Sequence, residues 1–335
     1  MDAVSRTAVT LDEVAKAAGV SRATASRVFT GSPKVSEAAR QAVERAATAL
    51  GYIPNPAARS LAGRRSESVG VVMPDPTVFY DPAISRLLRG IGSELSMNGL
   101  QMVLFAPQSD ADVTRLEHYL AAGHVDAVLL VMMLEMEALP TRLLSRGIPV
   151  VLGGRPKNGA QVSFVDVDNH AGGKNATEHL LGQGRRRIAH LADARHPLRS
   201  QGFREAMWNA ALRSDLVEFG DADREGGEMA MARLLSRGEE VDAVFAATDA
   251  MAIGAMWVMQ ALGRRVPDDV AIIGFDDSPL AATTQPALSS VRQPMEDMGR
   301  EMTRLVLSPD SRSPQQRILD PALAVRESTV VASTR

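Results

Sequence analysis

The chain of 335 residues contains no cysteine, and this absence excludes several kinds of chemistry. Without thiols there is no disulfide framework, no thiolate metal site and no cysteine nucleophile. The six histidines show no spacing typical of metal ligands, so neither a metal nor another cofactor is expected. These features favour a reducing, cytoplasmic setting.

Long apolar runs are also missing. No run approaches the roughly 18 residues of a membrane span, and residues 1–11 hold no apolar stretch of the kind found in secretory signals. No membrane partner is therefore expected. The composition, 45 % hydrophobic and 23 % charged, is that of a globular protein, and the length suits two or three domains.

The net charge of −3 is unevenly distributed. Residues 1–65 carry ten basic and five acidic side chains, whereas the rest of the chain carries 27 basic and 35 acidic ones. A small basic head on an acidic body suits a protein whose head binds a polyanion.

The first fifty residues read as three short helices. Thr10 and Glu13 fit a capping box at the start of the first helix. Gly19 is suited to end that helix, and Ser21 to cap the second. A third helix is expected from residue 36 to residue 50. Two helices joined by a tight glycine turn and packed on a third form the helix-turn-helix plan.

In that plan the second helix lies in the major groove of DNA. Its early residues Arg22, Ala23 and Thr24 would meet base edges, and Arg27 follows one turn later. Arginine suits guanine because its fork bonds O6 and N7 together. Hydroxyls suit phosphates, and they are offered by Thr10, Ser26 and Thr30. An ordinary three-helix domain with exposed arginines is the alternative reading.

From residue 68 onward apolar strand-like runs alternate with helical stretches. The expected strands are Val69–Met73, Leu100–Phe105, Ala127–Met133, Pro149–Leu152, Val162–Val167, Ile188–Ala192, Ala243–Ala247 and Val270–Phe275. Strands buried on both faces and separated by helices predict doubly wound parallel sheets. About 270 residues exceed one such core, so we expect two lobes. The predicted fold is an all-α head on an α/β body.

Two motifs give the chain a resemblance. Residues 10–28, with T-L-D-E-V-A, G-V-S and T-A-S-R-V, resemble the head of the LacI/GalR family of bacterial transcription regulators. Residues 52–62, Y-I-P-N-P-A-A-R-S-L-A, resemble that family's hinge. The resemblance implies a helix-turn-helix domain over 1–51, a hinge helix and linker over 52–66, and an effector-binding and dimerisation body of two lobes, similar to periplasmic binding proteins, over 67–335.

The resemblance also implies how the head binds DNA. Leu11 lies in the first motif and joins the DNA-contacting set. In the hinge, Leu61 matches the wedge that enters the minor groove, and Asn55 and Ala58 match neighbouring contacts. A homodimer on a near-palindromic operator follows. A small apolar anchor on the body is the alternative role for Leu61.

Ligands of open α/β sheets bind beyond the carboxyl ends of the strands. The loops there offer Asp75, Phe79, Tyr80, Arg155 and Asp249. The resemblance implies effector contacts at Arg199, Thr248, Asp276 and Gln293. Three alternatives concern other roles: Asp249 as a helix cap, Arg155 in a salt bridge between the lobes, and Trp208 as core instead of an aromatic wall. Asp277 is expected to be structural.

These features favour a repressor that a sugar or sugar derivative releases from its operator. A purine or phosphorylated corepressor is the alternative within the family. An enzyme is disfavoured because the sequence has no phosphate loop, no Gly-x-Ser-x-Gly and no His-Glu-x-x-His. A sugar-binding transport protein would suit the body, but the basic head and missing signal segment argue against it.

Overall fold

The computed structural model describes residues 9–30, 32–52, 66–73, 82–131, 138–156, 159–309 and 313–330. The head consists of α1 (Leu11–Ala17), α2 (Arg22–Phe29) and α3 (Glu37–Leu50). Thr10 and Glu13 form the predicted capping box, and Ser21 caps α2 by accepting a hydrogen bond from the Thr24 amide at 3.1 Å. Small side chains fill the core between the three helices, so they pack closely.

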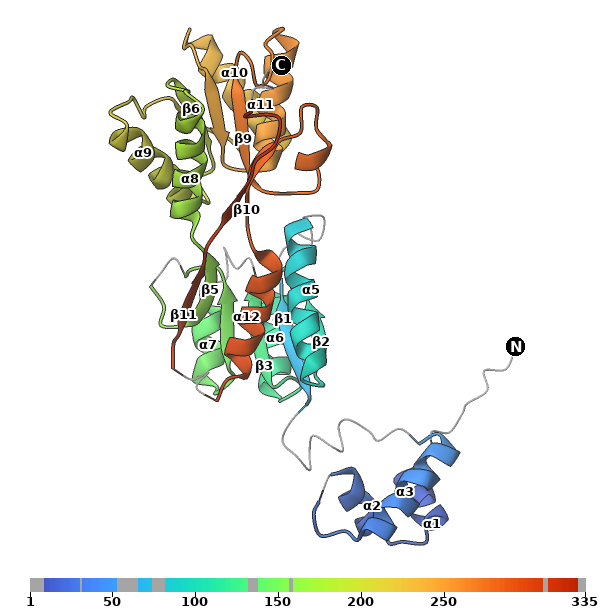
Figure 1. The fold of residues 1–335 in the computed structure, drawn as a ribbon. Coiled ribbons are helices and arrows are strands. Elements are labelled where there is room, and N and C mark those ends of the chain that lie inside the picture. Colours follow the sequence, from blue (N-terminus) through green and yellow to red (C-terminus); the bar gives the residue numbers. More distant parts are fainter. Residues whose placement is uncertain are drawn as a thin grey trace, which may run out of the picture.

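The first lobe of the body is a six-stranded parallel sheet with helices on both faces (Figure 1). Its order is β11-β5-β4-β3-β1-β2, with β1 (Ser68–Val72), β2 (Gln101–Phe105), β3 (Ala127–Val131), β4 (Val150–Gly153), β5 (Ser163–Val167) and β11 (Gln316–Leu319). One face is covered by α5 (Pro82–Met97) and α12 (Met295–Leu307). The other is covered by α6 (Asp110–Ala121) and α7 (Leu139–Ser145). Apolar, buried residues on both faces of the central strands β1, β3 and β4 explain this double cover.

The second lobe repeats this design. Its order is β12-β10-β9-β8-β6-β7, with β6 (Ile188–Ala192), β7 (Val217–Phe219), β8 (Ala243–Ala246), β9 (Ala271–Asp276), β10 (Ser289–Arg292) and β12 (Ala322–Ala324). One face packs against α8 (Asn169–Gly182) and α9 (Pro197–Asn209). The other packs against α10 (Arg224–Ser236) and α11 (Asp249–Ala261). A short 3-10 helix, η2 (Ala281–Thr283), follows β9.

The chain passes between the lobes three times, from β5 to α8, from β10 to α12 and from β11 to β12 (Figure 1). The last passage brings β12 back in the opposite direction, so it pairs antiparallel with β10. The predicted fold, an all-α head with two doubly wound lobes, is confirmed. The sequence did not indicate β7, β10, β11 and β12, which are three or four residues long and partly exposed. No helix in the described part of the chain is long and apolar enough to cross a membrane.

Candidate functional site

The first candidate surface is the outer face of α2. Arg22, Ala23 and Arg27 are exposed on it, as a base-reading helix requires. Arg22 lies 3.4 Å from an Asp12 carboxylate oxygen, but both side chains are largely exposed, so this ion pair holds the arginine weakly. The guanidinium is therefore available to a guanine edge.

The hydroxyls predicted to bind phosphates differ in their surroundings. Thr10 is exposed but engaged in the capping box, which holds the pKa of Glu13 below its usual range. Thr30 is exposed and donates to the carbonyl of Arg27 at 3.2 Å. Ser26 and Leu11 are half-buried. The hinge residues Asn55, Ala58 and Leu61 lie outside the described residues.

The second candidate site lies at the carboxyl edge of the second lobe, where α8 and α9 approach unusually closely. A Cβ at Gly173 would lie 2.2 Å from the carbonyl oxygen of Arg199, and one at Gly202 would lie 2.1 Å from that of His170. Only glycine permits this approach. The contact places Arg199, in the first turn of α9, directly beyond the strands.

The buried guanidinium of Arg199 organises this edge. Its Nε donates to Asn169 Oδ1 at 2.8 Å, and its Nη1 donates to the carbonyl of Ala247. Its Cζ lies 3.6 Å from the centroid of the Phe275 ring. Burial lowers the pKa of Arg199, while nearby carboxylates act to raise it, chiefly those of Asp276 and Asp193. The arginine is thus the central cation of an acidic cluster.

Asp276 ends β9 and joins two other predicted residues. Its Oδ1 lies 3.4 Å from Nη1 of Arg199 and accepts a hydrogen bond from Nε2 of Gln293 at 2.6 Å. A quarter of the Asp276 side chain is exposed, against 3 % for Arg199. The structure therefore brings together Arg199, Asp276 and Gln293 and presents a carboxylate to solvent. Such a carboxylate can accept hydrogen bonds from adjacent hydroxyls of a sugar.

Thr248 and Asp249 lie at the start of α11. Thr248 caps the helix by accepting from the amide of Met251 at 3.2 Å, so the alternative role of Asp249 as the helix cap is wrong. Asp249 points inward instead, accepting from Ser290 Oγ at 2.5 Å and from the amide of Ser278 at 2.6 Å. Both residues lie at the predicted edge, but their side chains are engaged within the protein.

Burial, together with the neighbouring charge of Asp276, raises the pKa of Asp249 to about 7. Because the unfolded carboxyl has an ordinary pKa of 3.8, the folded state binds the proton more tightly. The stability contributed by this proton is fully present below pH 4 and is lost as the pH rises through 7. The free energy of unfolding should thus fall by up to about 1.4 kcal/mol per pH unit from this group.

The Asp249→Asn variant should lose this pH dependence, because its amide can accept from Ser278 and donate to Ser290. Urea unfolding followed by circular dichroism at pH 5, 6, 7 and 8 measures the effect. The wild-type protein should lose stability relative to the variant as pH rises. Parallel curves for the two proteins would mean that Asp249 is already ionised at pH 5.

Two residues missed by the sequence analysis complete the cluster. Asn169 follows β5 directly and holds Nε of Arg199. Asp193, just after β6, accepts from Nδ1 of His196 at 2.8 Å and from Arg195. Burial acts to raise the pKa of Asp193, but the His196 and Arg195 hydrogen bonds outweigh it and hold the pKa well below its usual range. Their positions beyond strand ends were a usable signal.

The structure also places three other residues considered in the sequence analysis. Arg155 pairs with Asp166 at 3.7 Å, and because both residues belong to the first lobe, this ion pair does not join the two lobes. Trp208 is 82 % exposed near the end of α9, at the opposite edge of the sheet, so it is neither core nor a wall of this site. Asp277 is structural, as expected, and pairs with Arg292 and Arg326 at 2.6 Å each. Asp75, Phe79 and Tyr80 lie outside the described residues.

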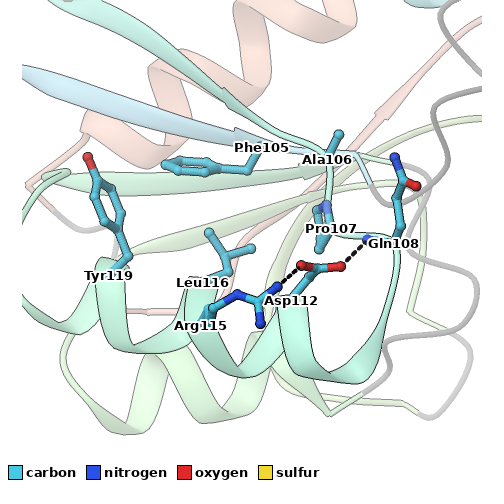
Figure 2. A pocket seen from close by; sticks show the side chains of 8 residues that line it. All are labelled: Phe105, Ala106, Pro107, Gln108, Asp112, Arg115, Leu116 and Tyr119. Atoms are coloured by element: carbon cyan, nitrogen blue, oxygen red, sulfur yellow. Dashed lines mark hydrogen bonds and ion pairs between the residues drawn. The ribbon is translucent and has the colours of Figure 1, made fainter.

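A pocket of about 460 Å³ lies elsewhere, on the outer flank of the first lobe between β2 and α6 (Figure 2). Figure 2 shows Phe105 and Tyr119 at one end and Gln108 at the other, with Arg115 paired to Asp112. Of the predicted effector residues that the structure describes, none lines it. Within the described ranges, no group of three histidine, aspartate or glutamate side chains is arranged to hold a metal.

Comparisons with known proteins identify both the head and the body of the chain. The profile of bacterial regulatory proteins of the lacI family matches residues 10–55, and that of a periplasmic binding protein-like domain matches residues 177–329. The HTH-type transcriptional regulator CelR of Thermobifida fusca is 45 % identical over 332 residues, covering 95 % of this chain and 98 % of CelR. The chain belongs to the LacI family. Like the relatives named as HTH-type transcriptional regulators, it is a transcriptional regulator and not an enzyme.

Solved structures of LacI-family proteins share the whole architecture. A complex of CelR with cellobiose is 43 % identical and superposes with a TM-score of 0.73, covering 96 % of this chain and 99 % of that one. A lac repressor dimer bound to operator and to the anti-inducer ONPF is 26 % identical, with a TM-score of 0.85, covering 97 % of this chain and all of that one. The head and the two-lobed body therefore follow the family architecture.

Proposed function

We propose that this LacI-family regulator is a cytoplasmic, sequence-specific repressor that leaves its operator when a sugar binds between its lobes. The sugar we propose is cellobiose or a closely related glucoside. The observation that carries this proposal is the 43 % identity to a regulator solved with cellobiose, over almost the full length of both chains. The domain limits remain those of the sequence analysis: head 1–51, hinge 52–66 and body 67–335.

The charges at the effector edge support a neutral ligand. Around the buried cation of Arg199 lie the carboxylates of Asp276, Asp193, Asp249 and Asp166. An anionic ligand would meet this acidic surrounding and lose more solvation than it regains. A sugar hydroxyl can both donate to Asp276 and accept from Gln293. The arrangement thus favours a sugar over a phosphorylated corepressor.

A titration tests the proposal directly. Operator DNA is first selected from a random pool by the protein, and binding to it is then followed by fluorescence anisotropy. Cellobiose should release the DNA, and glucose at the same concentration should act more weakly because it fills half the site. Tightening of the DNA complex by cellobiose would overturn the inducer role, and no response to any sugar would overturn the sugar proposal.

In the head, we propose that Arg22, Ala23, Thr24 and Arg27 read bases while Thr10, Leu11, Ser26 and Thr30 fix the helix on the backbone. Asn55, Ala58 and Leu61 are proposed minor-groove contacts of the hinge. Arg22→Ala should weaken operator binding by about 1–3 kcal/mol and relax the preference at one base pair. Arg45→Ala is the matched control, because it removes an equal charge from α3, outside the proposed base-reading helix.

Binding of each variant to the selected operator and to single-base variants of it separates these roles. Arg22→Ala should lose affinity for the operator alone, whereas Arg45→Ala should have a small effect that is equal on all sequences. Equal losses on operator and random DNA for Arg22→Ala would reject direct base reading by this residue.

We propose that the protein assembles as a homodimer. Each chain carries one helix-turn-helix head, and a near-palindromic operator offers two half-sites that two symmetry-related heads would occupy. β2 lies at the end of the first sheet, and its side chains Met102 and Leu104 are exposed, as are Met97 on α5 and Tyr119 on α6. An exposed apolar edge strand is a liability unless something covers it. On the second lobe Trp257 is similarly exposed. These surfaces support dimerisation through both lobes.

A further inference from the structure

One residue of the first lobe contacts the effector edge of the second. Arg86, in the second turn of α5, donates from Nη2 to the carbonyl oxygen of Asp276 at 3.0 Å and from Nη1 to that of Asp277 at 3.2 Å. These two bonds join residues 190 and 191 positions apart in the chain. They are charge-assisted, which makes them stronger than ordinary hydrogen bonds.

The peptide that Arg86 holds has an unusual conformation. Asp276 has φ 104° and Asp277 has φ 48°, a region that side chains other than glycine adopt at a cost. Two consecutive residues in such a conformation persist only where their surroundings enforce it. On the side of the second lobe, Ser290 Oγ accepts from the Asp277 amide at 3.0 Å, and Arg292 and Arg326 hold its carboxylate. From the first lobe, Arg86 holds both carbonyls.

This conformation determines where the effector carboxylate points. At φ 104° the side chain of Asp276 is directed to Arg199 and Gln293, and a quarter of it stays exposed. Arg86 holds the backbone carbonyls of this segment and so acts on the carboxylate through the backbone. The Nε of Arg86 is buried and has no hydrogen-bond partner among the described residues. The two Nη hydrogen bonds therefore offset the cost of removing this guanidinium from water.

We propose that Arg86 is a positioning residue for the sugar site and makes sugar affinity depend on how the two lobes are arranged. The inference rests on the proposed function, because it assigns to Arg86 the regulation of the same site. When the lobes keep the arrangement seen here, Arg86 holds the Asp276–Asp277 peptide and the carboxylate is preorganised. When the lobes move apart, the bonds break and the strained peptide relaxes.

The test uses the intact protein and three variants. Arg86→Met keeps the length of the side chain but donates nothing, and Arg86→Lys restores one donor in place of a fork. Arg89→Met is the matched control, since Arg89 lies on the same helix and is exposed. Cellobiose affinity is measured by calorimetry. Hydrogen exchange of the free proteins is measured at the amides of Asp277 and Ser278, which bond to Ser290 and Asp249.

Arg86→Met should raise the Kd for cellobiose about tenfold and speed exchange at the two amides, with Arg86→Lys between it and wild type. Arg89→Met should change neither quantity. Unchanged affinity with unchanged exchange overturns the proposal, and so does an equal effect of Arg89→Met. If the unaltered protein does not bind cellobiose, the sugar proposal fails, and exchange in the free proteins still decides the role of Arg86: faster exchange supports it and unchanged exchange overturns it.

Discussion

Asp276→Asn should abolish the response of the protein to cellobiose while leaving its affinity for operator DNA within about threefold of wild type. The Asp276 carboxylate is the exposed acceptor of the effector cluster, and Arg199 and Gln293 hold it in place. Hydrogen bonds to a charged group contribute about 1.5–3 kcal/mol each. The asparagine amide keeps one neutral acceptor oxygen and places a donor where the second oxygen stood. The loss of two charge-assisted bonds to sugar hydroxyls then corresponds to a loss of roughly a hundredfold in sugar affinity.

Asparagine is the suitable replacement because Asp276 has φ 104°. Asparagine tolerates positive φ better than alanine does, so the backbone is expected to keep its course. Asp268→Asn is the matched control, since Asp268 precedes β9 at the opposite edge of the sheet. Calorimetry with cellobiose and anisotropy with operator DNA measure both quantities. Normal sugar affinity in Asp276→Asn would remove Asp276 from the site.

Arg199→Met should destabilise the second lobe by about 3–5 kcal/mol at pH 7, the usual cost of removing one partner from a buried charge cluster. Arg199 is 2 % exposed and is the cation that balances the carboxylates of Asp276, Asp193, Asp249 and Asp166. Methionine fills the volume beside Phe275 but leaves these acids without a counter-charge. Thermal unfolding followed by circular dichroism measures the loss.

The pH dependence of the Arg199→Met variant separates charge from packing. Burial already raises the pKa values of Asp249 and Asp166, and removal of the nearby cation raises them further. Their protonation at low pH relieves the repulsion, so the destabilisation should shrink between pH 7 and pH 5. Arg213→Met, at an exposed ion pair with Asp215, should change stability little at either pH. A destabilisation of Arg199→Met that is constant with pH would mean that lost packing, not charge, dominates.

The helices of the head and the positions of the main strands along the chain were predictable because their signals are local. Thr10 with Glu13 begins α1, and Ser21 begins α2, each through hydrogen bonds between residues three positions apart. Gly51 has the left-handed φ of 67° that ends α3. Buried strands such as β3 are uninterrupted apolar runs. The short strands β10 and β12 lack this signal, because partners elsewhere in the chain determine that they pair.

The candidate site was predictable only in part. Arg199, Asp276 and Gln293 were expected at one edge, and the structure places them in contact. The sequence did not show which of Thr248 and Asp249 caps α11, because either side chain can cap a helix. The choice depends on Ser290 and Ser278, which lie in other segments and bind Asp249. Arg86 carries no sequence signal at all, since its role depends on how the two lobes meet.

The account depends on a coupling between sugar and DNA within one molecule, and thermodynamic reciprocity gives the most direct test. The Kd for cellobiose is measured by calorimetry on the intact protein, alone and with saturating selected operator DNA. Operator should weaken cellobiose binding by the same factor by which cellobiose weakens operator binding. An equal Kd for cellobiose in the presence and absence of operator would contradict the account.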